Sequence, residues 1–326
     1  MAELTIRREC WPVAGTFTIS RGAKTSADVV VVELGETNVL ARGECVPYLR
    51  YGETVDGVVE TIESLRRPLA EGLDRARLQD LLPAGAARNA VDCALWDLEA
   101  KRDRKRVWKL TGTALPEPTV TAETISLGTI EEMAAAAARL SRNPLIKVKL
   151  DAENVVERMR VVRRNAPDAR LIIDPNESWD LDLLYDIVQV LAELGVEMIE
   201  QPLPAAADDG LEEFTSPVPL CADESCHTAA DLERLRGKYQ MINIKLDKSG
   251  GLSEALALAR GATEAGFEIM IGCMVATSLA MAPAMVLAPF ARFVDLDGPL
   301  LLERDRDLGL KFSNGKIYPP GPGLWG

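Results

Sequence analysis

The chain has 326 residues, of which 47% are hydrophobic and 27% are charged, and its formal net charge is −13 at pH 7. This composition is typical of a soluble globular protein, and the length allows roughly two domains. The acidic balance argues against a nucleic-acid partner, and no uncharged apolar run approaches the ~20 residues that span a membrane.

The N-terminus and the cysteines indicate a cytoplasmic protein. Residues 1–8 have no long apolar segment behind their charges, so they do not form a secretory signal. The six cysteines are scattered without metal-ligand spacing, which is typical of reduced thiols in a cytosolic protein. We therefore expect no membrane partner.

The first part of the chain is predicted to form an α+β unit, with strands first and helices after. Its expected elements are strands at 16–20 and 29–34, the basic loop 20–25 between them, an irregular loop at 43–54 and, most clearly, a helix at 86–104. Pro116 and Pro118 interrupt both ladders and helices, so they predict a boundary there. We expect one domain over residues 1–118.

Beyond this boundary strands and helices alternate. Strands are expected near residues 120, 146, 172, 198, 220, 242, 269 and 293, with helices at 130–140, 152–165, 181–194 and 253–266. Charged residues end five strands at intervals of roughly 25 residues, the period of a parallel β/α barrel: Lys149, Asp174, Glu200, Asp223 and Lys245. A doubly wound open sheet is the alternative, but no Gly-rich phosphate motif follows the first strands. We predict a barrel over 119–300, with 301–326 packing on the N-terminal domain.

Three carboxylates end successive strands. Because the strands of a barrel end at one mouth, Asp174, Glu200 and Asp223 are predicted to lie together there. Three hard oxygen ligands suit one Mg²⁺ ion, which keeps other positions for water or a substrate carboxylate. A His-rich zinc site is excluded, because the chain has a single histidine.

Lysines bracket the three carboxylates. Lys147 and Lys149 are two residues apart, so both point to one face of their strand, and Lys245 ends the strand after the carboxylates. A substrate held between Lys149 and Lys245 can lose a proton to one amine and regain it from the other on the opposite face, which inverts a stereocentre. The metal would offset the second negative charge of the enediolate that forms. We expect the cluster of cations to lower the lysine pKa values, so that the amines can act as bases.

Several motifs, in this order, resemble those of the enolase superfamily. The chain is similar to its muconate-lactonizing subgroup, and within it to the dipeptide epimerases, over essentially its whole length. The motifs are Ser20-Arg21-Gly22, residues 83–90, Lys147-Val148-Lys149, Asp174-Pro175-Asn176, Glu200-Gln201-Pro202, and residues 221–225, 243–251 and 295–298. Ala276 departs from the pattern, because many members of the subgroup carry Glu there, so we expect a changed pocket wall.

The resemblance implies a fold and a set of roles. The fold would be α/β, a modified TIM barrel of the (β/α)₇β type, capped by the N-terminal α+β domain whose loops reach over the mouth. The implied roles are Mg²⁺ binding by Asp174, Glu200 and Asp223, acid/base catalysis by Lys149 and Lys245, and orientation of the ligands by Asn176 and Glu224. Lys147 would help to hold the substrate carboxylate or the enediolate.

The substrate is predicted from a pair of acidic residues. Asp295 and Asp297 end the last strand on one face, so together they can bind a cation such as the α-ammonium of a dipeptide. Within the family this pair marks the dipeptide epimerases; the alternative is a structural pair bonded to backbone amides. On the capping loops, Arg21 and Lys24 are expected to pair with an acidic side chain of the substrate, and Tyr51 to contact the substrate.

We therefore expect a cytoplasmic, Mg²⁺-dependent isomerase that epimerises the C-terminal residue of L-Ala-L/D-Glu-like dipeptides, which the resemblance associates with murein peptide metabolism. The alternatives are another activity of the subgroup, namely o-succinylbenzoate synthase, cycloisomerase or N-acylamino acid racemase, and a catalytically silent binding protein. Synthase and cycloisomerase substrates carry no ammonium and have no use for Asp295 and Asp297. The sequence leaves the exact dipeptide and homo-oligomeric assembly open.

Overall fold

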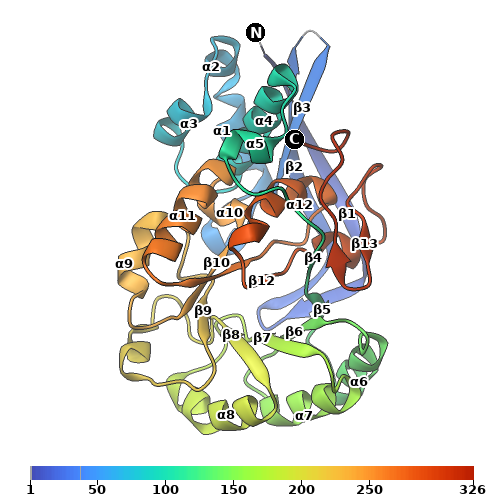
Figure 1. Ribbon diagram of the computed structural model, residues 1–326, viewed down its shortest axis with the longest axis vertical. Coiled ribbons are helices and arrows are strands. Elements are labelled where there is room, and N and C mark those ends of the chain that lie inside the picture. Colours follow the sequence, from blue (N-terminus) through green and yellow to red (C-terminus); the bar gives the residue numbers. More distant parts are fainter. Residues whose placement is uncertain (1, 37) are drawn as a thin grey trace.

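The computed structural model describes residues 2–36 and 38–326 and has an N-terminal α+β part beside a β/α barrel (Figure 1). The N-terminal part begins with a three-stranded antiparallel sheet in the order β1 (Glu3–Ile19), β2 (Gly22–Glu36) and β3 (Val39–Cys45). The helices that follow it are η1 (Leu49–Tyr51), α1 (Val55–Glu63), α2 (Arg66–Ala70), α3 (Arg75–Leu81), α4 (Ala86–Asp103) and α5 (Val107–Thr111). Strands precede helices, as predicted.

The β1–β2 hairpin is longer than predicted, because the two strands have 17 and 15 residues. Near the turn at Ser20–Arg21 most side chains are at least partly exposed, so no alternation of buried and exposed residues marks the strands in the sequence. Lys24 therefore lies in β2 and not in a loop. The turn reaches the barrel, where Leu127 N donates a hydrogen bond to Thr18 O at 3.0 Å.

Helix α4 packs directly on β3 at Gly43. A Cβ atom added there would lie 2.1 Å from Ala90 O and 2.8 Å from Ala94 N, and both atoms belong to the α4 backbone. The strand and the helix are therefore in backbone contact, and glycine is needed because any side chain would push them apart.

Gly43→Ala is expected to lower the free energy of unfolding by about 2 kcal/mol or more, because overpacking of a closed contact costs about that much. Urea unfolding followed by circular dichroism measures the change. Gly35→Ala is the control, since a Cβ atom there meets nothing closer than Glu3 O at 3.8 Å. Equal unfolding midpoints for the two variants would contradict the close packing of α4 on β3.

Eight parallel strands form the second sheet, and they lie side by side in chain order. They are β5 (Glu123–Ile125), β6 (Leu145–Lys149), β7 (Arg170–Asp174), β8 (Val196–Glu200), β9 (Leu220–Ala222), β10 (Met241–Ile244), β11 (Glu268–Ile271) and β12 (Phe293–Val294). Just before β5, Ala122 N donates to Val294 O of β12 at 2.8 Å, so the first and last strands meet. A doubly wound sheet would reverse its strand order, so the predicted barrel is confirmed and the alternative is wrong.

Helices cover the outside of the barrel (Figure 1). Those closest to the predicted ranges are α6 (Ile130–Arg139), α7 (Val155–Asn165), α8 (Leu181–Glu193) and α11 (Leu252–Glu264). The remaining helices are η2 (Asp209–Glu213), η3 (Ala229–Asp231), α9 (Leu232–Leu235), α10 (Leu246–Ser249), α12 (Ser278–Ala284), η4 (Met285–Phe290) and η5 (Gly298–Leu301). The barrel strand expected near Val120 is a wrong prediction. That segment is β4 (Thr119–Val120), which pairs with β14 (Lys316–Ile317) from the far end of the chain.

Inward-facing side chains of the barrel form an apolar layer below a charged layer. The apolar layer holds one buried residue from each strand or its start, namely Ala122, Leu145, Ile172, Met198, Cys221, Met241, Met270 and Phe293. Side chains two residues further along a strand point to the same side, because successive side chains alternate. These next positions hold Lys147, Asp174, Glu200, Asp223, Asn243 and Asp295. Strand alternation therefore puts the charged residues at the barrel mouth.

The C-terminal segment contacts the N-terminal part. Arg306 Nη2 lies 2.6 Å from Glu44 Oε2 of β3, and Trp325 Nε1 donates to Cys93 O of α4 at 3.0 Å. A short strand, β13 (Phe312–Ser313), pairs with β14.

The domain boundary at residue 118 stays a prediction. Among the helices of residues 2–36 and 38–326, none is long and apolar enough to span a membrane.

Candidate active site

The charged layer at the barrel mouth is almost completely buried. Asp174 and Glu200 end β7 and β8, Asp223 directly follows β9, and the three residues are 0%, 0% and 1% exposed. Lys149 ends β6 and Lys245 directly follows β10, so the three carboxylate strands lie between the two lysine strands. In a closed barrel this order puts the two lysines on different sides of the carboxylates.

Both of these lysines are ion-paired with the carboxylates. Lys149 Nζ lies 2.5 Å from Asp174 Oδ2, and Lys245 Nζ lies 2.6 Å from Asp223 Oδ2 and 3.8 Å from Glu200 Oε1. Buried charges are tolerated when they are paired in this way, whereas removal of one partner leaves an uncompensated charge. The carboxylates and lysines therefore form one interdependent network.

Lys147 connects the network to the last strand. Its Nζ lies 2.6 Å from Glu200 Oε2, 3.2 Å from Asp174 Oδ2 and 2.8 Å from Asp295 Oδ2. One buried ammonium group thus contacts two of the predicted metal ligands and one member of the predicted ammonium-binding pair. The two predicted subsites are therefore adjacent.

Burial and charge pairing shift the pKa values in opposite directions. Burial favours the neutral acids, but the lysine ammonium groups hold the pKa values of Asp174 and Asp223 well below their usual range. Burial likewise lowers the pKa values of Lys147 and Lys245, but the facing carboxylates outweigh it and raise both well above the usual range. Without a divalent cation these two pKa values are therefore raised, and the lowering expected for the cluster with Mg²⁺ stays a prediction. A divalent cation on the carboxylates would remove this stabilisation of the ammonium forms.

The donor set fits a hard divalent cation. Asp174, Glu200 and Asp223 supply carboxylate oxygens from three neighbouring strands, the ligands that Mg²⁺ prefers. Glu200 Oε2 is buried and lies 2.6 Å from the Lys147 ammonium, so a positive charge already occupies the position that an ion would take. Within the described residues, no three His, Cys, Asp or Glu side chains could hold an ion as they stand. The amine of Lys147 lies between the oxygens, so it would have to move aside.

Three residues of the motifs, to which the sequence assigned no role, hold the carboxylates in place. Asn243 Nδ2 donates to Glu200 Oε1 at 2.7 Å, Lys248 Nζ donates to Asp223 Oδ1 at 2.6 Å, and Gln201 Oε1 accepts from Asp223 N at 2.9 Å. Such partners orient metal ligands. Asn243 lies on the inward face of β10, so strand alternation could have found it. Gln201 and Lys248 lie in the motifs that carry the resemblance, but no local pattern indicates that they contact Asp223.

The two predicted orienting residues act differently from each other. Asn176 holds Asp174 through its backbone, because Asn176 N donates to Asp174 Oδ1 at 2.8 Å. Glu224 is paired with Arg21, whose Nη2 lies 2.7 Å from Glu224 Oε1, while Glu224 Oε2 is buried without a hydrogen-bond partner. Burial and the charge of Asp223 raise the pKa of Glu224 to about 7.

Asp295 and Asp297 converge on the same cavity but have different partners. Asp295 Oδ2 accepts from Lys147 Nζ, and Asp295 Oδ1 is buried without a hydrogen-bond partner among the described residues. Asp297 Oδ2 accepts from the backbone amide of Thr124 at 2.7 Å. Burial and the neighbouring Asp295 raise the pKa of Asp297 to about 7. The alternative of a purely structural pair therefore accounts for an oxygen of Asp297 but not for Asp295 Oδ1.

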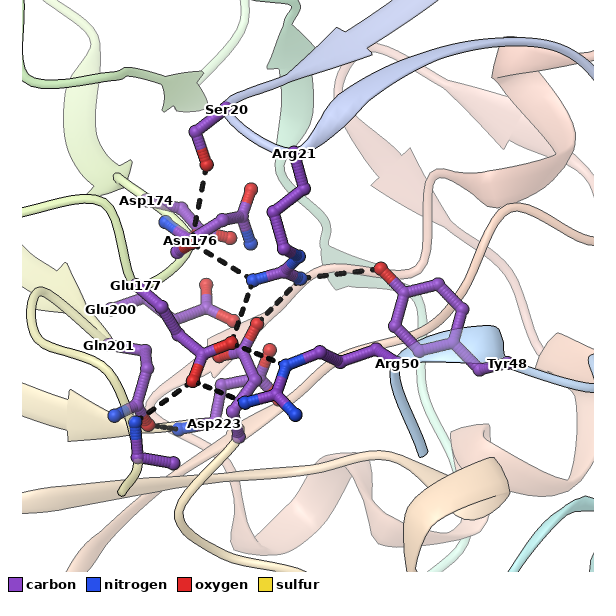
Figure 2. Close-up of polar contacts among 12 residues, drawn as sticks. Ser20, Arg21, Tyr48, Arg50, Asp174, Asn176, Glu177, Glu200, Gln201 and Asp223 are labelled. Atoms are coloured by element: carbon purple, nitrogen blue, oxygen red, sulfur yellow. Dashed lines mark hydrogen bonds and ion pairs between the residues drawn. The ribbon is translucent and has the colours of Figure 1, made fainter. Parts of the chain in front are cut away.

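A cavity of about 820 Å³ lies between the cap loops and the barrel mouth. Arg21 already binds barrel residues (Figure 2), whereas Lys24 Nζ lies 4.9 Å from the centre of the Tyr48 ring and forms no ion pair with any residue that the structure describes. Asp174 and Glu200 lie below the cavity, and the other predicted site residues line it, namely Arg21, Lys24, Tyr51, Lys147, Lys149, Asn176, Asp223, Glu224, Lys245, Asp295 and Asp297.

The structure is that of a two-domain barrel enzyme. A cap covers a β/α barrel, and a buried layer of carboxylates and lysines lies at the barrel mouth under the cap. Residues 1–112 match the family described as mandelate racemase / muconate lactonizing enzyme, N-terminal domain, and residues 130–324 match the enolase C-terminal domain-like family. The chain belongs to the mandelate racemase / muconate lactonizing enzyme family of the enolase superfamily. The resemblance seen in the sequence is confirmed.

Two relatives match nearly the whole chain. The L-Ala-D/L-Glu epimerase of Escherichia coli (strain K12) is 49% identical over 320 residues, which covers 98% of this chain and 100% of the relative. The N-acetyl-D-glutamate racemase of Pseudoalteromonas sp. is 45% identical over 301 residues, which covers 91% of this chain and 95% of the relative. The prediction that the chain is an isomerase is confirmed by these relatives.

Solved structures agree with this family. An enolase family member from Agrobacterium tumefaciens with homology to dipeptide epimerases, with bound sodium and L-Ala-L-Glu, has a TM-score of 0.98 and 49% identity, covering 100% of both chains. A dipeptide epimerase from Enterococcus faecalis V583, complexed with Mg and L-Leu-L-Tyr, has a TM-score of 0.92 and 28% identity, covering 100% of this chain and 99% of that one. The predicted fold is confirmed, and the predicted Mg²⁺ agrees with such complexes.

Proposed function

We propose that this chain is a Mg²⁺-dependent dipeptide epimerase that inverts the α-carbon of the C-terminal residue of L-Ala-L/D-Glu-like dipeptides. The observation that carries the proposal is Asp295 Oδ1, which is buried and has no hydrogen-bond partner in the described part of the chain. The same side chain contacts Lys147 and through it the predicted metal ligands. A ligand that fits both subsites has a carboxylate at one end and an ammonium group a short distance away. A dipeptide has both groups.

Lys149 and Lys245 are the two proton carriers in this proposal. One amine takes the α-proton and the other returns a proton on the opposite face, because their strands lie on different sides of the carboxylates. Lys147 holds the substrate carboxylate. When bound, Mg²⁺ supplies the positive charge that offsets the second negative charge developing on that carboxylate. Asp174, Glu200 and Asp223 hold the ion.

Recognition of an acidic side chain falls to the cap. Lys24 lines the cavity without an ion pair to residues 2–36 or 38–326, so it is available to a substrate carboxylate, whereas Arg21 would have to exchange its present partners. Both cations favour Glu or Asp at the epimerised position. Tyr51 supplies an aromatic wall, packed edge-on against His227 at 4.6 Å between ring centres.

The kcat/KM for a dipeptide is expected to fall as the pH drops below about 7, because the raised pKa of Asp297 keeps this carboxyl protonated under acidic conditions. The ionised form, which attracts the substrate ammonium, is present above that pH. Initial rates between pH 5.5 and 9 measure the profile, and Asp297→Asn is expected to flatten it. A fall that persists in Asp297→Asn would assign the titration to another group, such as Glu224.

An N-acylamino acid racemase is the second candidate, favoured by the N-acetylglutamate racemase relative at 45% identity. An N-acetyl group has no charge, so it would leave Asp295 Oδ1 without a cation. Protonated Asp297 could instead donate to the acetyl oxygen. The two candidates therefore differ in the protonation state of Asp297 that they use.

The deciding experiment is deuterium incorporation at the α-carbon in D₂O with Mg²⁺ present. L-Ala-L-Glu and N-acetyl-L-glutamate are compared at equal concentrations by ¹H NMR. Faster exchange with inversion in L-Ala-L-Glu supports the epimerase, and faster exchange in N-acetylglutamate supports the racemase. Exchange in neither would refute both candidates.

A further inference from the structure

Glu177, in the loop after β7, accepts hydrogen bonds from three separate segments (Figure 2). Its Oε2 accepts from Arg21 Nη1 at 3.1 Å and from Arg50 Nε at 2.9 Å, and its Oε1 accepts from Arg50 Nη2 at 2.8 Å and from Ala205 N at 2.9 Å. Arg21 lies in the β1–β2 turn, Arg50 in η1 and Ala205 after β8. One carboxylate thus ties both cap loops to the barrel.

The backbone of this loop is in a conformation that residues other than glycine rarely adopt. Asn176 has φ +48° and Glu177 has φ +67°, both in the left-handed region. Hydrogen bonds to the cap and to the barrel compensate for the energetic cost of this backbone conformation. Asn176 O accepts from Arg21 Nη1 at 2.9 Å and from Ser20 Oγ at 3.2 Å, while Asn176 N donates to Asp174. The loop therefore connects the cap hairpin to a predicted metal ligand.

Arg21 is held on both of its terminal nitrogens. Nη1 donates to Asn176 O and Glu177, and Nη2 lies 2.7 Å from Glu224 Oε1 and 3.3 Å from Tyr48 Oη. The side chains of Glu177 and Glu224 are only 7% and 1% exposed, so solvent screens these ion pairs weakly. Charge-assisted bonds of this kind are about twice as strong as neutral ones.

We propose that Glu177 is a positioning residue that acts through Arg21 and Arg50 to hold the two cap loops closed over the cavity, and so keeps Lys24 facing the substrate. Without the Glu177 carboxylate, no negative charge would lie between the guanidinium groups of Arg21 and Arg50, and the two positive charges would repel each other. The loops that carry them line the cavity, so their separation opens it. The inference rests on the proposed function for the nature of the substrate only.

Limited trypsin proteolysis and steady-state kinetics of Glu177→Gln test this role. Trypsin cleaves after Arg21 and Lys24, so it reports opening of the hairpin directly. We expect the initial rate of cleavage at these bonds to rise about tenfold, the size expected for losing a charged hydrogen bond. The KM for L-Ala-L-Glu should rise about tenfold while kcat stays within about threefold, since substrate positioning is lost but the lysines are intact. Arg50→Met, which removes two of the four bonds, should change both readouts in the same direction.

Glu197→Gln is the matched control, because Glu197 forms a comparable two-pronged pair with Arg170 on the outside of β8. Cleavage and KM in that variant should stay within about twofold of the parent, as for most surface ion pairs. Parental cleavage and KM in Glu177→Gln would overturn the proposal. So would a fall in kcat without faster cleavage, because Glu177 would then act on Asp174 and not on the loops. If the parent turns over no dipeptide, the proposed function fails, while the cleavage rates still decide the role of Glu177.

Discussion

Replacing either of the two proposed proton carriers, Lys149 or Lys245, is expected to abolish epimerisation, while one stereoisomer of the substrate still exchanges its α-proton. In Lys245→Ala only Lys149 faces the α-carbon, so one of L-Ala-L-Glu and L-Ala-D-Glu should exchange its α-proton with D₂O. In Lys149→Ala the other isomer should exchange. The rate of epimerisation should fall by about 10³-fold or more, in line with the contribution of a positioned acid or base. ¹H NMR of each isomer in D₂O measures both rates.

Lys245→Arg separates the two roles of this amine. Arginine keeps the positive charge beside Asp223 but does not lose its proton, so it preserves the ion pair without supplying a base. We expect it to be as inactive in epimerisation as Lys245→Ala, with closer to parental stability. Exchange of the same isomer in both single-lysine variants would contradict the two-sided arrangement, and activity in Lys245→Arg would contradict proton transfer by Lys245.

The barrel and its charged layer were predictable because both follow from short-range rules. Strand and helix alternate at a regular period, and successive side chains of a strand point to opposite faces. Leu145, Lys147 and Lys149 therefore share one face of β6, and the carboxylates share the equivalent positions on the next three strands. Neither rule needs knowledge of distant contacts.

The partners of the charged groups could not be predicted in this way. The bond between Lys147 and Asp295 joins positions 148 residues apart, and the bond between Arg21 and Glu177 joins positions 156 residues apart. The pKa values of Lys147 and Lys245 depend on such partners, because without a divalent cation the facing carboxylates outweigh both burial and the neighbouring cations. The segment of β4 was assigned to the barrel for the same reason, because its pairing with β14 from the far end of the chain places it in another sheet.

Glu200→Gln is expected to weaken divalent-cation binding by at least about 100-fold. Loss of a residue that only orients a metal ligand can already lower metal affinity by up to about 100-fold, and this substitution removes the charge of a ligand itself. Glu200 is the central member of the three carboxylates in the sheet order, and its Oε2 lies beside the Lys147 ammonium, where an ion would replace that amine. Epimerisation should fall to background at any Mg²⁺ concentration that saturates the parent, and EDTA should have the same effect on the parent until Mg²⁺ is restored.

Binding of Mn²⁺, followed by the electron paramagnetic resonance signal of the free ion, measures this loss without relying on turnover. Glu197→Gln is again the control, because Glu197 lies on the same strand β8 but pairs with Arg170 at the surface. It should bind Mn²⁺ like the parent. Since Lys147 Nζ lies 2.6 Å from Glu200, the Gln variant also loses a charge that stabilises this ammonium. Parental Mn²⁺ affinity in Glu200→Gln would mean that the three carboxylates hold lysines only, and the metal-dependent function would have to be abandoned.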